Sequence, residues 1–338
     1  MPGFSPIPPL EFWPYHRCVA PPTYARLTRF ALWALATIVV TGAAVRLTGS
    51  GLGCEDWPTC SEDRFVADLE YHALIEFLNR LFTGVVALAV IAAVLGSWIR
   101  RPRRRDLTVL SLGLVAGVLA QVVLGALLVR TELDPRFTMG HFLLSMVLLL
   151  NAAVLDVRAR PGAPETGARE TEVRETTGAR ETDVSHRVDP WTRLMPRAVL
   201  AVGAVLLVTG TLVTGAGPHA GDSRAERLPL LVQEVARIHG VVALSLLVLV
   251  VWTWWRLRSA GAPAQARMGR VALLLGAQGV IGYTQYFTGV PALLVGIHVA
   301  LASVVWIEIV KAACGPAAAE AAAPSYRSAG AAIAGASP

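Results

Sequence analysis

The stretch from Leu107 to Val129, LTVLSLGLVAGVLAQVVLGALLV, contains no charged residue and is long enough to cross the hydrocarbon core of a membrane as a helix. Similar runs recur along the 338 residues, of which 54% are hydrophobic and only 16% charged. With a mean hydropathy of +0.54, this composition is typical of an integral membrane protein and excludes an ordinary soluble domain. The runs predict an all-α protein with eight transmembrane helices, at about 27–45, 73–98, 107–129, 138–156, 197–214, 234–255, 271–288 and 291–311.

The arginines predict which side of the membrane each loop faces. They are concentrated before the first run, after the second, between the fourth and fifth, and after the sixth, whereas the alternate loops hold few. By the positive-inside rule, both chain ends of this multi-pass protein therefore face the cytoplasm, and the cell membrane is the expected location. Orientation explains the net charge of +6, so no nucleic-acid partner is expected. Residues 1–24 lack the pattern of a cleavable signal peptide, and we expect the first span to be retained.

One pattern occurs twice in the apolar runs. A Gln-x3-Gly motif at 121–125 precedes His141, and the same motif at 278–282 precedes His298 at the same spacing. The sequence Val-Thr-Gly also recurs, at 40–42 and 208–210. The repetition indicates a duplicated unit.

A polar segment divides the chain between the two copies. Residues 158–196 are rich in Arg, Glu and Thr and predict a flexible cytoplasmic linker. Four spans lie on each side, so the two halves have the same orientation in the membrane. We therefore expect two parallel four-helix-bundle repeats, at 1–157 and 197–313, followed by a disordered tail at 314–338.

Three histidines fall in the outer half of the membrane: His141, His239 and His298. Ionisable residues inside a membrane are costly and usually functional. Two neutral imidazoles from facing helices can hold a haem iron from both sides, and His239 and His298 form such a pair. The alternative is that each histidine only bridges helices by a hydrogen bond. In the second span, the residue equivalent to His239 is Asn79 in one register of the repeat and Thr83 in another, so that span lacks the histidine.

Glu76 is an acid close to the outer end of the second span, and Arg80 follows one helical turn later on the same face. One interpretation is a buried ion pair that orients the helix. The other is a proton donor or acceptor beside a haem, with Arg80 able to bind a haem propionate.

Cys54 and Cys60 lie in the first outer loop, on the oxidising side of the membrane, where a disulfide is expected. Cys18 and Cys314 lie on the cytoplasmic side and are expected to be free thiols. We expect His72 and His219, at the outer surface, to be solvated bystanders.

Together these motifs resemble the haem A synthase family. The resemblance covers both halves and rests on Arg46-Leu-Thr-Gly-Ser-Gly-Leu-Gly-Cys54, Asp56-Trp-Pro58, Cys60, Ile75-Glu-Phe-x-Asn-Arg80, and Gln121-Val-Val-Leu-Gly125 before His141. It implies a membrane oxidoreductase that converts the C8 methyl of haem O to a formyl group, giving haem A for cytochrome oxidase. Haem O would be the substrate, delivered by haem O synthase, and the electron donor is not identified.

By position, the resemblance implies a haem b cofactor on His239 and His298, and substrate haem O near His141 with Asn79 and Arg80. Glu76 would be the catalytic acid, and Cys54 and Cys60 would be the cysteine pair beside the substrate. Many members have histidine where Asn79 stands, and some carry a second cysteine pair in the third outer loop that is absent here. The alternative function is a haem b membrane cytochrome that relays electrons from quinol; a haem transporter is a weaker option.

Overall fold

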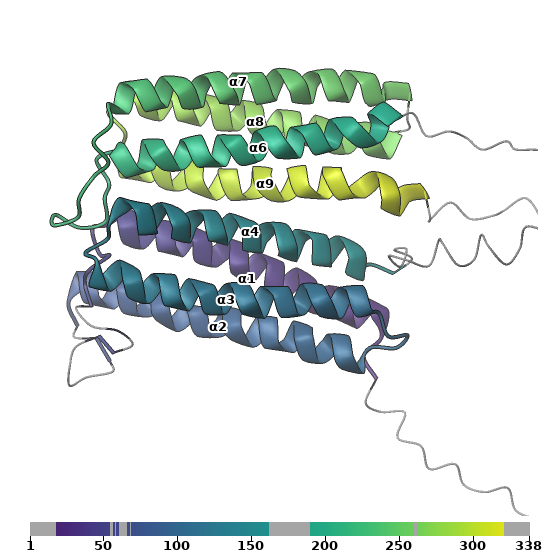
Figure 1. The fold of residues 1–338 in the computed structure, drawn as a ribbon, viewed down its shortest axis with the longest axis horizontal. Coiled ribbons are helices and arrows are strands. Elements are labelled where there is room, and N and C mark those ends of the chain that lie inside the picture. Colours follow the sequence, from purple (N-terminus) through teal and green to yellow (C-terminus); the bar gives the residue numbers. More distant parts are fainter. Residues whose placement is uncertain are drawn as a thin grey trace, which may run out of the picture.

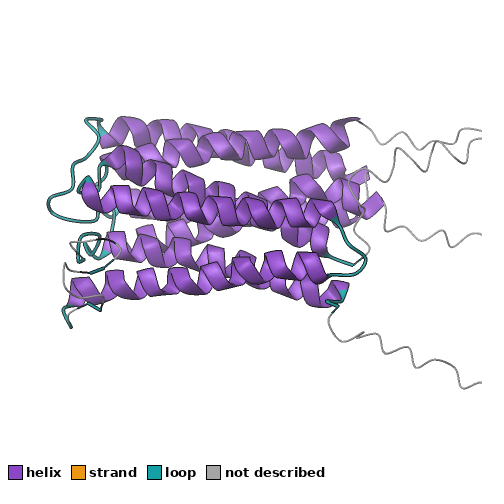
Figure 2. Ribbon diagram, turned by 60° about the horizontal axis from the view of Figure 1, so that its bottom comes forward, coloured by secondary structure: helices purple, strands orange, loops and turns teal. Residues whose placement is uncertain are grey.

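The chain is entirely helical over the part that the computed structural model describes, which is residues 18–54, 57, 59–60, 66–67, 69–161, 190–259 and 262–320. Its eight long helices run alternately up and down, with the connections at the two ends (Figures 1 and 2). They are α1 (Pro21–Leu47), α2 (Tyr71–Ile99), α3 (Arg105–Arg130), α4 (Pro135–Ala159), α6 (Pro190–Ala216), α7 (Val232–Arg256), α8 (Ala262–Phe287) and α9 (Ala292–Glu320). The all-helical class is confirmed.

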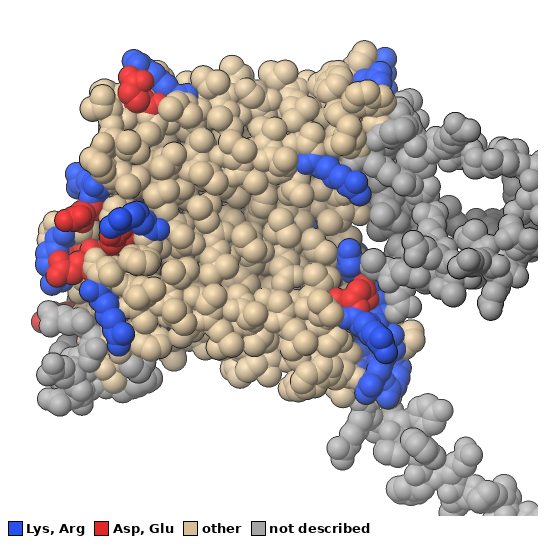
Figure 3. Space-filling model, in the orientation of Figure 1, with Lys and Arg blue, Asp and Glu red and all other residues tan. Residues whose placement is uncertain are grey.

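Seven of the long helices in the described chain are long and apolar enough to cross a membrane. The other is α8, whose first half carries Arg267 and Arg270 and whose second half carries Gln278 and Gln285. Charged side chains gather at the two ends of the face drawn in Figure 3, and the band between them contains few. This distribution is that of a multi-pass membrane protein.

The helices extend beyond the apolar runs. α4 continues to Ala159 and α6 begins at Pro190, so both edges of the expected linker are helical, and its residues 162–189 lie outside the described part. α9 continues past Cys314 to Glu320, and only 321–338 of the expected tail lie outside. A helix that leaves the hydrocarbon needs no apolar side chains to stay helical, which is why hydropathy underestimates its length.

Helices α1 to α4 pack against one another, as do α6 to α9, and the two sets meet mainly along α4 and α9 (Figure 1). Trp306 of α9 is buried at this junction, where its indole N–H donates to the backbone oxygen of Met146 in α4 at 2.8 Å. The helices that carry His141 and His298 are therefore direct neighbours.

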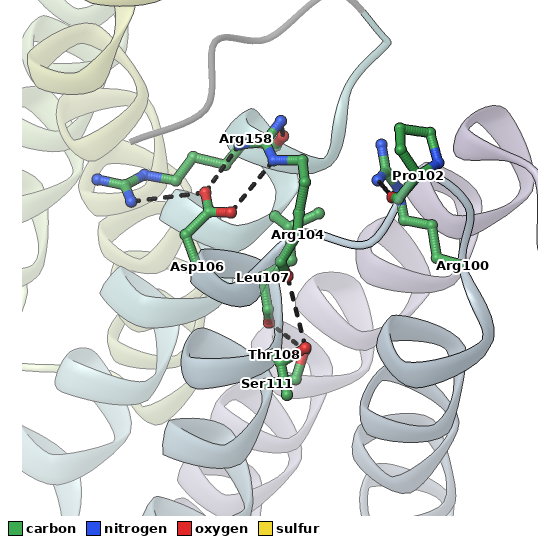
Figure 4. A network of polar contacts seen from close by, with 8 residues as sticks. All are labelled: Arg100, Pro102, Arg104, Asp106, Leu107, Thr108, Ser111 and Arg158. Atoms are coloured by element: carbon green, nitrogen blue, oxygen red, sulfur yellow. Dashed lines mark hydrogen bonds and ion pairs between the residues drawn. The ribbon is translucent and has the colours of Figure 1, made fainter. Parts of the chain in front are cut away.

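Buried polar contacts fix the end of the α1–α4 set opposite to the first loop (Figure 4). Arg104 pairs with Asp106 at 2.7 Å and also donates to the backbone oxygen of Arg158, which closes the start of α3 onto the end of α4. One turn into α3, Ser111 bonds the Tyr24 hydroxyl of α1 at 3.0 Å. These bonds set the position of α3 relative to α1 and α4.

The turn before α4 is determined by the residues of the turn itself. Glu132 and Leu133 adopt positive φ angles of 50° and 64°, and Asp134 then caps the helix by accepting from the backbone N–H of Arg136 at 2.8 Å. The hydrogen bonds from the Arg136 side chain and backbone hold the pKa of Asp134 below its usual value. Pro135, as the first helical residue, completes a well-defined start for α4.

Candidate functional site

The predicted disulfide closes the loop between α1 and α2 on itself, and this loop packs against α2. Cys54 and Cys60 are bonded, and the sulfur-bearing residues are buried against Ala73. Gly53 passes so close to α2 that a Cβ there would lie 2.4 Å from the backbone oxygen of His72. The glycine is therefore required for the loop to reach the helix that carries Glu76.

Glu76 is buried between this loop and Arg80. Its Oε2 accepts from the backbone N–H of Cys54 at 2.8 Å, while its Oε1 accepts from Arg80 at 2.5 and 3.1 Å. Arg80 also donates to the backbone oxygen of Thr59 at 2.9 Å. The ion pair considered from the sequence is thus present, and it also anchors the disulfide loop at both sides.

Asn79, beside Arg80 on α2, bonds to α1. Its Oδ1 accepts from the hydroxyl of Thr41 at 2.8 Å. In the other half, Thr209 occupies the place of Thr41 in the repeated Val-Thr-Gly motif, and its hydroxyl bonds Nδ1 of His239 at 3.1 Å. The matching threonine bonds favour the register that pairs Asn79, and not Thr83, with His239.

His141 and His298 are each held by the glutamine of the repeated motif. Gln121 donates to the backbone oxygen of His141 at 3.0 Å, and Gln278 donates to that of His298 at 2.9 Å. The ring Nδ1 atoms of both histidines are buried and have no hydrogen-bond partner among the described residues. The bridging alternative considered from the sequence therefore does not account for the Nδ1 atom of either histidine.

His239 lies on α7 and His298 on α9, in the same set of helices. Each ring packs on a glycine, since a Cβ at Gly210 or Gly282 would lie 3.1 Å from the Cε1 atom of His239 or His298. The structure thus places both histidines of the expected pair in the α6–α9 set. In the N-terminal half it brings Glu76 and Arg80 onto the disulfide loop, but within the described residues Glu76 and His141 share no hydrogen bond.

Arg46 and His219 have structural roles that were not predicted from the sequence. Arg46 donates to the backbone oxygens of Thr214 at 2.9 Å and His219 at 2.6 Å, and so joins the end of α1 to the end of α6 and to the loop after it. His219 Nε2 in turn bonds the backbone oxygen of Val290 at 2.8 Å, so it is a link between loops and not a solvated bystander. In the sequence, Arg46 could have been singled out by its place at the start of the motif that ends at Cys54.

His72, the other histidine expected to be a bystander, is exposed as predicted. It is not without a contact, because its Nδ1 bonds the Ser50 hydroxyl at 3.0 Å. The bond ties the start of α2 to the loop that follows α1.

The donors present fit a haem better than a metal ion held by protein alone. No group of three or more His, Cys, Asp or Glu side chains in the described residues could hold a metal ion. A haem iron takes only its axial ligands from the protein, so two imidazoles are sufficient. His239 and His298 lie in the same set of helices, α6 to α9, and supply two such imidazoles.

The chain is similar to proteins of one family. The chain matches the COX15-CtaA family, described as cytochrome oxidase assembly protein, over residues 25–66 and 65–310. It is 32% identical over 126 residues to a heme A synthase of Lysinibacillus sphaericus (strain C3-41), covering 36% of this chain and 41% of that protein. It is 32% identical over 135 residues to a heme A synthase of Geobacillus thermodenitrificans, covering 37% and 40%.

A heme A synthase of Listeria welshimeri is 29% identical over 123 residues, covering 36% of this chain and 40% of that protein. The aligned part of the chain thus spans only about 40% of the length of these curated relatives. The family match, in contrast, runs through all eight long helices. On that match, the chain belongs to the COX15-CtaA family of cytochrome oxidase assembly proteins.

Proposed function

We propose that this protein is a haem A synthase, a membrane oxidoreductase that converts the C8 methyl of haem O to a formyl group. The family match and the relatives named heme A synthase support the reaction class. The observation that carries the proposal is the asymmetry of the repeat: equivalent threonines bond a histidine in one half and an asparagine in the other. Two halves with different ligand sets suit an enzyme with one cofactor and one substrate.

The C-terminal half is proposed to bind a haem b cofactor through His239 and His298. When bound, haem b supplies one-electron transfer. The Thr209 hydroxyl, at Nδ1 of His239, leaves Nε2 as the nitrogen available to iron. Gly210 and Gly282 allow both rings to lie close against the neighbouring helices, so that neither ring is displaced by a side chain behind it.

The N-terminal half is proposed to bind substrate haem O through His141. Asn79 is shorter than an imidazole, and a Cβ at Gly42, the counterpart of Gly210, meets no atom within 4 Å. The face opposite His141 therefore has no strong ligand from α2, and an open face is what oxygen chemistry at an iron needs. Arg80 is positioned to pair with a substrate carboxylate as well as with Glu76.

Glu76 is proposed to accept and release protons during methyl oxidation. Arg80 and the Cys54 N–H donate to its two oxygens, and these bonds offset the cost of a charged carboxylate in a buried place. The disulfide between Cys54 and Cys60 keeps that N–H donor in position. The loop therefore acts on the site through Glu76.

The remaining features complete the proposal. The two halves, α1 to α4 and α6 to α9, are taken as parallel four-helix-bundle repeats joined by the segment between α4 and α6, with both termini in the cytoplasm. The histidine sites then face the outer half of the cell membrane. Haem O synthase in the same membrane is the proposed source of substrate, and a membrane electron donor completes the reaction.

The proposal is tested by expressing the chain in a host that makes haem O and lacks haem A, then extracting the haems with acid and separating them by chromatography. We expect haem A, together with its alcohol precursor. A haem b protein that yields neither compound would instead be an electron-relay cytochrome. The empty-vector strain is the control.

A further inference from the structure

The glutamine and glycine of the repeated Gln-x3-Gly motif lie one helical turn apart on the face that meets the histidine helix. Gln278 of α8 donates to the backbone oxygen of His298, and Gly282 lies against the ring of the same residue. The motif thus contacts one histidine at two points, the backbone and the imidazole.

The orientation of this imidazole depends on that contact. Histidines that bind a metal usually donate their second ring nitrogen to a hydrogen-bond acceptor, which fixes the ring plane. His239 has such a partner in Thr209, whereas Nδ1 of His298 has none in the described chain. The ring of His298 must therefore be directed by the position of its backbone and by the surface on which it lies.

A side chain at Gly282 would press on the imidazole of His298. A Cβ there would lie 3.1 Å from Cε1 and 3.6 Å from Nδ1 of His298, which is tighter than ordinary contact for the first atom. The N-terminal copy is looser, since a Cβ at Gly125 would lie 4.0 Å from Cε1 of His141. The glutamine bond is present in both copies, at 2.9 Å for Gln278 and 3.0 Å for Gln121.

We infer that Gln278 and Gly282 are positioning residues that set the plane and direction of the His298 imidazole at the haem, and that Gln121 and Gly125 do the same, less tightly, for His141. The inference rests on the proposed function, because it assigns a task to residues around the proposed haem ligands. The glutamine fixes the height and rotation of the histidine helix through a backbone carbonyl. The glycine then sets how closely the ring can approach the neighbouring helix.

The test compares purified, haem-b-loaded wild type with Gln278→Met and Gly282→Ala. Methionine has a similar volume to glutamine but no N–H donor, so the packing is kept while the bond is lost. The readouts are the g-values of the ferric haem by electron paramagnetic resonance, which report the relative orientation of the axial imidazole planes, and the midpoint potential. We expect both variants to stay folded by gel filtration and to show shifted g-values and a shifted potential.

Matched variants in the other half, Gln121→Met and Gly125→Ala, serve as controls. They are expected to leave the haem b g-values and potential unchanged, as is Thr284→Val, an exposed position on α8. Wild-type g-values and potential in both Gln278→Met and Gly282→Ala would overturn the inference, as would an equal shift in Gln121→Met. If Gly282→Ala does not fold, the g-values and potential of Gln278→Met alone decide whether the inference holds. Absence of haem b from the wild type would instead refute the proposed function.

Discussion

Replacing Glu76 with glutamine separates a catalytic role from a structural one. The Glu76 and Arg80 side chains are 8% and 20% exposed, and removing one partner of a buried pair costs about 3–5 kcal/mol. The introduced amide would keep an acceptor for the Cys54 N–H, and Arg80 would keep its bond to Thr59. We therefore expect the loss of unfolding free energy to lie at the lower end of this range, at about 3 kcal/mol. Loss of a proton-transfer group should also slow turnover by about 10²–10⁴-fold.

The assay measures haem A formed per haem b in purified protein, which corrects for any loss of folded enzyme, and thermal unfolding in detergent is recorded beside it. Asp134→Asn is the control, because it removes an acid at the same end of the bundle and asparagine caps a helix as well as aspartate does. Turnover per haem b within a few-fold of wild type in Glu76→Gln would mean that the residue is only structural. In that case the role proposed here is wrong.

Three further changes test other parts of the structure. Cys54→Ser opens a loop with a sequence separation of 6, and we expect its unfolding free energy to be about 2 kcal/mol below that of oxidised wild type. Thermal unfolding measures the loss, and the stability of the variant should match that of reduced wild type. Arg46→Gln removes two charge-assisted hydrogen bonds, so we expect a loss of about 2–3 kcal/mol in unfolding free energy. The control is Arg136→Gln, which should change the unfolding free energy little because the Arg136 side chain is 82% exposed. Equal losses in the two variants would contradict the structural role of Arg46. Asn79→His should convert the spectrum of the N-terminal haem to that of a low-spin, two-histidine centre and lower turnover; an unchanged spectrum would show that this residue does not face the iron.

The helices could be predicted from the sequence because hydropathy reports the environment that surrounds them. Their ends could not, as α9 shows by continuing to Glu320 after the apolar run has ended. The hydropathy of α8 is lowered by glutamines such as Gln278, whose amide N–H donates to another helix. A hydropathy scale applied to one segment cannot detect a hydrogen-bond partner that lies on a different helix.

The residues of the candidate site were proposed from the sequence, but most of the contacts between them were not. The repeat identified His141 and His298, and the spacing of Glu76 and Arg80 predicted their pairing. The bond from Glu76 to the Cys54 N–H joins a helix to a loop, and its geometry depends on the close approach at Gly53. Such contacts follow from tertiary packing and leave only an indirect trace in the sequence, such as a glycine where no turn is needed.

The central claim is that the two halves hold different haems for different purposes. Its most direct test is the haem content of purified His141→Ala and His298→Ala from a host that makes haem O. We predict that His141→Ala retains haem b but contains no haem O or haem A, whereas His298→Ala loses haem b. Loss of haem b from His141→Ala together with its retention in His298→Ala, or equal loss from both, would contradict the division of labour between the halves.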